Sequence, residues 1–306
     1  MKFELPLGDL VEAVVEFLMR HAQWLFDAIE IVVGGLADGI GAALEFPPDV
    51  VLAGLIVGLA FYRVGWKFAV FAAVALAVIF ALGLWPQTVD TLTLVLTATV
   101  IALILGIPLG IAAGRSDRIE SALRPMLDLM QTMPAFVYLI PAAMFFGLGT
   151  VPGVIATIVF ALPPVVRLTS LGIRQVPEEL VEAGLAFGCT SRQLLFKVQI
   201  PTALPSIMAG VNQTIMLALS MVVIASMIGA GGLGNQVLRG IQRLDIGLGF
   251  EGGLAVVLVA ILLDRITQSF GKPRTKSAPM TARGSTAPTS ESADRPAAMQ
   301  PAEPGA

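Results

Sequence analysis

Long runs of apolar residues constrain the fold of this chain more than any other feature. Of its 306 residues, 56% are hydrophobic and only 13% are charged, which lies outside the usual range for a soluble domain. A hydrocarbon core about 30 Å thick requires roughly twenty apolar residues per helix. The sequence therefore predicts an all-α integral membrane protein with about seven transmembrane helices. The predicted spans are 50–62, 68–84, 92–113, 126–148, 154–171, 203–228 and 246–266.

The first predicted span is short. Residues 50–62 rise only about 20 Å as a helix, so this span must extend through Pro47 and Pro48 or pair with its neighbour to cross. If it does not cross, the amino terminus changes sides. The chain divides into an N-terminal amphipathic segment at 1–48, peripheral transmembrane helices at 49–86, a transmembrane core at 87–271 and a tail at 272–306.

The N-terminal segment has a helical pattern of its own. Polar residues, most of them acidic, recur at steps of three or four between Asp9 and Glu30, and apolar residues fill the other faces. This pattern predicts an amphipathic helix that either lies in the membrane interface, against lipid, or packs on the rest of the protein. The acidic residues are unlike a secretory signal, so we expect the segment to be retained.

The placement of basic residues indicates the orientation in the membrane. Short cytoplasmic connections carry an excess of Lys and Arg, and here these residues gather on one side of the helix model. Arg239 and Arg243 fall on the other side and are a minority. The model places the amino terminus outside and the carboxyl terminus inside a cytoplasmic (inner) membrane. The basic residues on the cytoplasmic side are Arg63, Lys67, Arg115, Arg118, Arg124, Arg167, Arg174, Arg192, Lys197, Arg265, Lys272, Arg274 and Lys276.

Composition excludes several classes of function. The net charge of −3 and the scattered basic residues predict no nucleic-acid partner. One cysteine, Cys189, and one histidine, His21, exclude a Cys or His cluster for a metal ion, and we expect no cofactor. Residues 272–306 are rich in Pro, Ser, Thr and Ala, which predicts a disordered cytoplasmic tail.

The chain contains no apparent energy source for transport. It has no G-x-x-x-x-G-K-[ST] loop, so we expect no ATPase site and no enzymatic activity. Residues 229–234 have the spacing of a dinucleotide-binding loop, but they follow a long apolar helix instead of a strand, and we interpret them as a glycine-rich turn. Energy must therefore come from a partner or from a gradient.

Few ionisable residues lie deep in the predicted spans. Gradient-driven carriers usually hold such residues there for function. Asp128, Glu251 and Asp264 lie near predicted helix ends, and we interpret them as interfacial anchors, with Glu251 kept as a candidate for the substrate pathway. This scarcity of deep charge argues against a gradient-driven carrier.

Prolines interrupt the predicted spans, and the resulting kinks suit a pore that moves. Met133, Phe136 and Tyr138 surround one of them, Pro134. A quaternary ammonium group could meet Phe136 or Tyr138 by cation–π attraction, which makes these three residues candidates for the pathway. Helix packing is the favoured alternative for the same side chains.

A polar segment at 177–200 lies between two long apolar spans. Pro177, followed by two acidic residues, predicts the start of a first helix, and Gly188 predicts its end. Pro201 predicts the end of a second helix. A capped polar helix pair in this position offers a surface that a partner outside the membrane can bind.

This polar segment resembles the loop of ABC-importer permeases, which has a Glu-Ala-Ala stretch (the EAA motif), a Gly and a closing Ile-x-Leu-Pro. Gly184 stands where the third residue is usually Ala, and Val198 and Ile200 stand for Ile and Leu. These substitutions are small and apolar. The resemblance implies that the loop couples transport to a cytoplasmic ATPase. The residues that carry it are Glu182, Ala183, Gly184, Gly188, Val198, Ile200 and Pro201.

A narrower resemblance covers residues 84–271, to the glycine betaine/proline (quaternary amine) importer permeases of the ProW type. It implies a type I ABC-importer core and an osmoprotectant as substrate. In that family two permease copies form the pore, two cytoplasmic ATPase subunits drive alternating access, and an external binding protein delivers the substrate. It also makes Asn212 a pathway candidate. The runs that carry it are 127–141, 172–177, 196–199, 209–213 and 228–234.

Two alternatives stay open. A self-sufficient channel or gradient-driven carrier for a small solute would transport without any partner and without the Glu182 loop. A membrane scaffold that only docks partner proteins would not transport at all. The Glu182 loop and the scarcity of deep charge favour the ABC importer over both.

Overall fold

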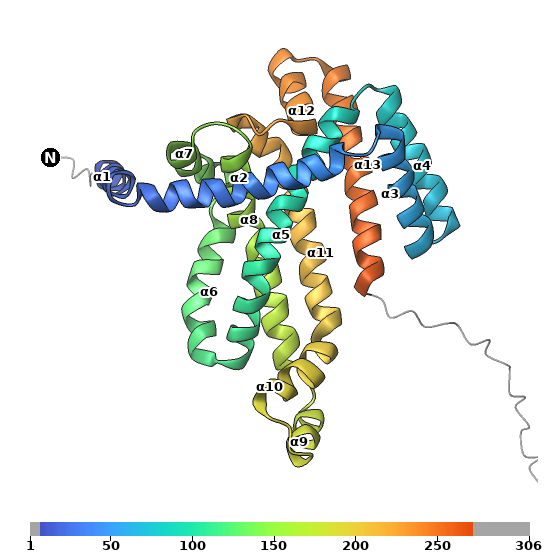
Figure 1. The fold of residues 1–306 in the computed structure, drawn as a ribbon. Coiled ribbons are helices and arrows are strands. Elements are labelled where there is room, and N and C mark those ends of the chain that lie inside the picture. The colour runs from blue at the N-terminus through green and yellow to red at the C-terminus, as the bar shows by residue number, and fades with distance from the viewer. Residues whose placement is uncertain (1–6, 272–306) are drawn as a thin grey trace, which may run out of the picture. The chain divides into compact units, whose positions relative to one another are not determined.

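Helices form the regular structure of residues 7–271, the range that the computed structural model describes (Figure 1). No strand occurs in this range. The predicted all-α fold is therefore confirmed. The tail predicted at 272–306, like residues 1–6, lies outside the described residues.

Three long helices form the centre of the bundle: α5 (Trp85–Arg115), α8 (Thr150–Arg174) and α11 (Ile200–Ala225). They pack along one another, and buried apolar residues of all three share one core. With α13 (Ile246–Gly271), they supply the four helices of the described range that are long and apolar enough to cross a membrane. The count rises to six if each of two bent helix pairs is one span.

Glycines bring α5 and α8 into close contact. Gly106, Gly110 and Gly114 are four residues apart and therefore lie on one face of α5. A Cβ atom at Gly110 would lie 2.6 Å from Thr169 Cβ and 2.7 Å from Val166 O, so only a glycine fits there. Small residues at such a stripe let two membrane helices approach backbone to backbone.

The segment predicted as one span at 126–148 is not a continuous helix. It consists of the end of α6 (Asp117–Thr132) and all of α7 (Ala135–Phe146), which meet at 98°. Met133 is extended, with φ −72° and ψ 137°, because the ring of Pro134 disfavours the helical conformation of the residue before it. The kink predicted at Pro134 is therefore a break between two helices.

The N-terminal part contains four helices: α1 (Leu7–His21), α2 (Gln23–Glu45), α3 (Asp49–Arg63) and α4 (Trp66–Ala81). The helix predicted between Asp9 and Glu30 is interrupted at Ala22, and α2 extends beyond it. Helices α2 and α3 meet at 94°. Helix α2 crosses α5 and α8, and Phe26 stacks on Phe145 of α7 with ring centroids 4.4 Å apart (Figure 1).

The glycine-rich residues after α11 form a turn, as predicted. A short 3-10 helix (Ser226–Ile228) leads to Gly229, Gly231 and Gly232, whose φ values are +86°, +78° and +71°. The turn starts α12 (Gly232–Arg243), and Leu233 N donates a hydrogen bond of 2.8 Å to Thr91 Oγ1 of α5. Left-handed backbone at three positions requires residues without a Cβ atom.

Candidate coupling loop and substrate pathway

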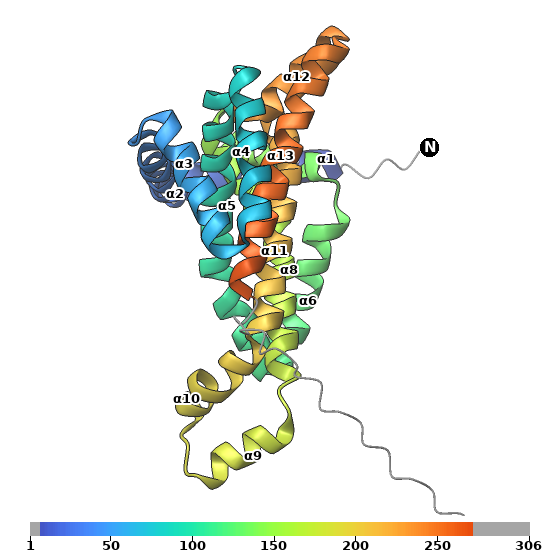
Figure 2. The same ribbon diagram turned by 90° about the vertical axis from the view of Figure 1, so that its right-hand side faces the viewer.

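The polar loop lies at the end of the bundle opposite α12 (Figure 2). Its first helix, α9 (Glu178–Ala186), begins directly after Pro177 and has acidic residues in its first turn. It ends before Gly188, whose φ of +76° is left-handed, and Cys189 N donates to Gly184 O at 3.0 Å. The predicted start and end of this helix are confirmed. Both were predictable because proline and glycine restrict or permit backbone conformations at their own positions.

The second helix does not end at Pro201, so that prediction is wrong. Helix α10 (Ser191–Leu194) begins with a capping box in which Thr190 Oγ1 accepts from Gln193 N and Gln193 Oε1 accepts from Thr190 N. A π-helical turn (Leu195–Gln199) then leads into α11. Pro201 lies in the first turn of α11, where a proline is tolerated. Thr202 Oγ1 donates to Val198 O at 2.7 Å, which satisfies a carbonyl at the irregular turn.

Gly184 is the point where the two helical parts of the loop touch. A Cβ atom there would lie 2.7 Å from Leu194 Cδ1 and 3.8 Å from Val198 Cγ2. Gly184 is buried and Val198 is half-buried, so both residues lie in the contact between the two helical parts of the loop. Ile200 packs on an apolar cluster that joins α8 to α11.

The remaining candidate coupling residues are exposed. Glu182, Ala183, Gly188 and Pro201 all face away from the rest of the chain. They share this surface with large apolar side chains that the sequence analysis missed: Leu180, Leu185, Phe187 and Phe196, of which Phe187 is 90% exposed. Large apolar residues are unusual in an otherwise polar loop, and this feature of the sequence could have identified them.

Met133, Phe136 and Tyr138 lie together at the bend between α6 and α7. The hydroxyl of Tyr138 donates to Leu129 O at 3.0 Å and Met130 O at 2.8 Å, so it ties α7 back to the last turn of α6. Met133 is half-buried, and Phe136 is 52% exposed. The predicted pathway residues of this region are therefore neighbours in space, beside backbone that is not helical.

Asn212 lies in a different place, between α11 and α13. Its Nδ2 donates to Asp264 Oδ1 at 2.9 Å, and Thr267 Oγ1 donates to its Oδ1 at 3.0 Å. Gln268 Nε2 donates to both oxygens of Asp264 at 2.8 Å. Asp264, expected to be an interfacial anchor, instead joins two helices. The amide of Asn212 is used in the same network.

Glu251 belongs to neither group. It lies in the second turn of α13 and is exposed, about 20 Å along the helix from Asp264. The five pathway candidates thus occupy three places. Among the side chains that the structure describes, no three Cys, His, Asp or Glu residues come together as a possible metal site.

Spanning helices around a protruding polar helix pair define the class of this protein: a multi-pass membrane permease. The chain belongs to the family of binding-protein-dependent transport system inner membrane components, whose model matches residues 106–272. The match includes the bend, the Glu182 loop and the glycine-rich turn.

Similar proteins of known name agree with this family. The chain is 50% identical over 268 residues to the glycine betaine/proline betaine transport system permease protein ProW of Escherichia coli (strain K12), which covers 88% of this chain and 76% of that protein. It is 50% identical over 272 residues to the glycine betaine/carnitine transport permease protein GbuB of Listeria monocytogenes, and this match covers 88% of this chain and 96% of that protein. It is 46% identical over 265 residues to the glycine betaine transport system permease protein OpuAB of Bacillus subtilis, and this match covers 87% of this chain and 94% of that protein.

The fold is similar to that of a solved ABC importer. An inward-facing structure of the MetNI methionine ABC transporter matches with a TM-score of 0.53 and 21% sequence identity, over 61% of this chain and 92% of that one. At this identity the match concerns the fold alone. It agrees with the type I importer core expected from the sequence.

Proposed function

We propose that this chain is the permease subunit of an ABC importer for glycine betaine or a related quaternary amine. The observation that carries the substrate class is the likeness at 46–50% identity, along nearly nine-tenths of the chain, to three permeases whose names include glycine betaine. Such substrates carry a cationic group without N–H donors. Recognition of that group favours aromatic faces over hydrogen-bond acceptors.

The Glu182 loop is the docking site for a cytoplasmic ATPase in this proposal. Exposed Phe187 and Phe196 offer apolar anchors, and Glu182 adds a charge for orientation. A small, pre-formed helix pair can bind in a groove with little loss of conformational entropy. ATP-driven closure of two such ATPases would move the loop and switch the pore between inward-open and outward-open states.

The proposed assembly also contains a second copy of this chain and an external binding protein. The amino terminus lies outside and the carboxyl terminus inside. Arg63 supports this orientation, because its guanidinium lies 3.6 Å from the ring centroid of Phe270 near the end of α13. The basic turn between α3 and α4 and the carboxyl end of α13 therefore lie on the same side as each other, as the predicted orientation requires.

We place the substrate pathway at the bend that contains Met133, Phe136 and Tyr138. Phe136 is accessible, whereas the half-buried ring of Tyr138 packs on an apolar cluster and its hydroxyl is bound to backbone carbonyls. Asn212 and Glu251 are secondary candidates, because the amide of Asn212 is already bonded and Glu251 lies apart.

The first experiment is purification of the chain from its native membrane in mild detergent, with identification of the proteins that co-purify. ATP hydrolysis is then measured with and without glycine betaine and the candidate binding protein. We expect an ATPase subunit whose activity the loaded binding protein stimulates. Recovery of the chain alone, still able to transport in liposomes, would instead establish a gradient-driven carrier or channel.

A charge reversal tests the coupling role. Glu182→Arg should lower import about tenfold while the protein still folds, since the loop contributes little to the bundle core. Asp27→Arg is the matched control, an exposed acid of α2 away from the loop. Normal import by the Glu182 variant would contradict the docking role.

A further inference from the structure

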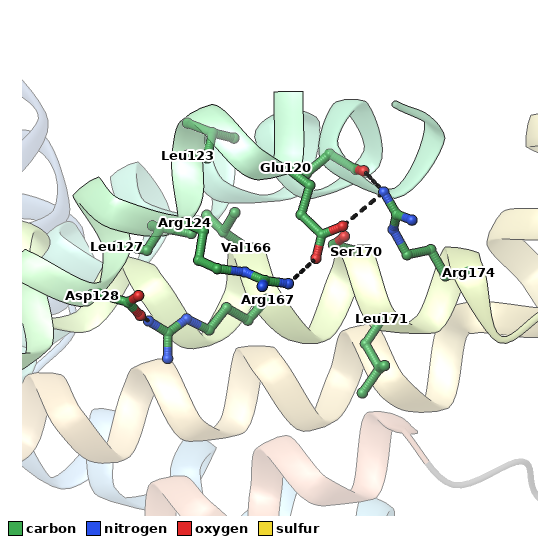
Figure 3. Close-up of a pocket in the computed structure, with 11 residues that line it drawn as sticks. Glu120, Leu123, Arg124, Leu127, Asp128, Val166, Arg167, Ser170, Leu171 and Arg174 are labelled. Carbon is green, nitrogen blue, oxygen red and sulfur yellow. Dashed lines mark hydrogen bonds and ion pairs between the residues drawn. The ribbon is translucent and has the colours of Figure 1, made fainter. Parts of the chain in front are cut away.

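Helix α6 is attached to α5 and α8 by a small apolar cluster and by charged side chains. Leu127 is its one buried residue within the described chain, and Leu123 and Met130 pack only partly against α5 and α8. A pocket of about 350 Å³ lies between α6 and α8, and buried Ser170 Oγ lines it without a hydrogen-bond partner (Figure 3). The apolar contact between these two helices is therefore incomplete.

Two arginines of α8 bridge this incomplete contact. Arg167 and Arg174 are seven residues apart, two helical turns, and so point from the same face. Arg167 pairs with Asp128 of α6. Both arginines reach toward acids of α6 in Figure 3. Each interaction joins residues far apart in the chain, so neither stabilises a single helix locally.

Arg174 binds three groups at once. Its Nη1 lies 2.6 Å from Asp117 Oδ1, and its Nη2 lies 2.9 Å from Glu120 Oε2 and 2.8 Å from Ala113 O. Both acids are in the first turn of α6, and Ala113 O is at the carboxyl end of α5. A planar guanidinium with several donors suits this geometry, whereas a single exposed ion pair would add little.

The position of Arg174 connects this cluster with the Glu182 loop. It is the last residue of α8, and only three residues separate it from α9. At its other end, α6 leads into the bend at Met133 and Pro134. A displacement of α9 acts first on the end of α8, and the ion pairs of the two arginines link α8 to α6.

We propose that Arg167 and Arg174 are positioning residues that make α6 follow α8, so that movement of the coupling loop reaches the bend that contains Met133, Phe136 and Tyr138. The inference rests on the proposed function as an ATP-driven importer. The physical basis is a two-level ionic clamp across a contact that apolar packing leaves incomplete. Without the clamp, α8 would move while α6 stays behind.

The test uses the full transporter, with its ATPase and binding protein, in proteoliposomes. The double variant Arg167→Gln, Arg174→Gln should lower import about tenfold while ATP hydrolysis falls less than about twofold, so that more ATP is used per solute imported. Arg118→Gln is the matched control, because Arg118 is an exposed arginine of the same helix α6 and makes no ion pair with α8 among the described residues. It should behave like the wild type.

A charge swap separates the clamp from a general effect on folding. Asp128→Arg alone places two arginines together and should uncouple import, whereas adding Arg167→Asp restores the pair and most of the import. Import by the charge-swapped protein can be measured even if the double variant Arg167→Gln, Arg174→Gln (the double neutral variant) fails to fold. Equal loss of import in the single and swapped proteins would overturn the proposal.

A distance measurement reports the movement itself. In a Cys189→Ser background, spin labels at Ser121 of α6 and Leu171 of α8, both exposed, should keep the same separation with and without ATP. In the double neutral variant the separation should change on ATP binding. An unchanged ATP-to-solute ratio in that variant would refute the clamp, provided that wild-type import is coupled to ATP. Uncoupled wild-type transport would instead refute the proposed function.

Discussion

The two chain reversals at opposite ends of the bundle use glycine in opposite ways. In the glycine-rich turn after α11, glycines are packed against other helices: Cβ atoms at Gly232 and Gly234 would collide with Thr91 and with the backbone of Val222. In the Glu182 loop, Gly188 is surrounded by open space, with nothing within 4 Å of a Cβ atom. Both reversals have left-handed backbone, but only the first is part of the core.

This difference agrees with the roles proposed for the two reversals, a structural turn and a docking surface for a partner. The glycine-rich turn is held by hydrogen bonds to α5 and to its own Ser226, whose hydroxyl donates to Gly231 O at 3.0 Å. The Glu182 loop instead exposes Phe187 beside its turning glycine. Substitutions in the first should therefore destabilise the fold, and substitutions in the second should impair transport while the fold stays intact.

The largest effect is expected from Gly234→Ala. The added methyl group would overlap Val222 O and Ser226 Oγ, and backbone atoms cannot move aside easily. We expect the free energy of unfolding to fall by about 3 kcal/mol, which lowers the thermal unfolding midpoint in detergent. Gly54→Ala, in α3 with nothing within 4 Å of the added atom, is the control and should not destabilise. Similar midpoints for the two variants would contradict the packed turn.

Thr91→Val tests the bond that holds the turn to α5. Valine has the same shape but cannot accept from Leu233 N, which would remain buried without a partner. We expect a loss of about 2 kcal/mol in the free energy of unfolding. Thr97→Val is the control, since the Thr97 hydroxyl bonds only within its helix, to Thr93 O at 2.6 Å. If both variants lose the same stability, the bond to the turn has no special role.

Phe187→Ala tests the other side of the comparison. If the loop docks an ATPase as proposed, removal of this exposed aromatic side chain should lower import about tenfold through weaker ATPase binding, with no change in the thermal midpoint. Phe46→Ala is a closely matched control, because Phe46 is 91% exposed at the turn between α2 and α3. An equal fall in import for both variants would mean that Phe187 is not a specific contact.

Much of this fold follows from local chemistry in the sequence. Apolar length predicts where α5, α8, α11 and α13 cross, and the backbone limits of Pro177 and Gly188 predict the bounds of α9. These features depend on residues close together in the chain. The sequence was also sufficient to interpret the glycine-rich residues as a turn, because they follow a long apolar helix instead of a strand.

Two of the interactions that the sequence did not predict join residues far apart in the chain. Arg174 and Asp117 are 57 residues apart, and Asn212 and Asp264 are 52 apart, so their pairing depends on how whole helices pack. The failure at Pro201 is local: the proline lies in the first turn of α11, directly after the π-helical turn, where its missing N–H group is tolerated. A single residue type such as proline predicts a local restriction, but its neighbours decide whether the helix stops there.

The smallest effect on import among the loop variants is expected from Gly188→Ala, the counterpart in the loop of Gly234→Ala. The new side chain has room, so the only penalty is its left-handed φ of +76°, about 1 kcal/mol. The exposed loop can relieve that strain by unwinding locally, which leaves the thermal midpoint of the bundle nearly unchanged. In the proposed docking role, the rearranged loop would move the Phe187 side chain, so import should fall about fivefold. A lowered midpoint with normal import would show that the loop supports the bundle and does not serve a partner.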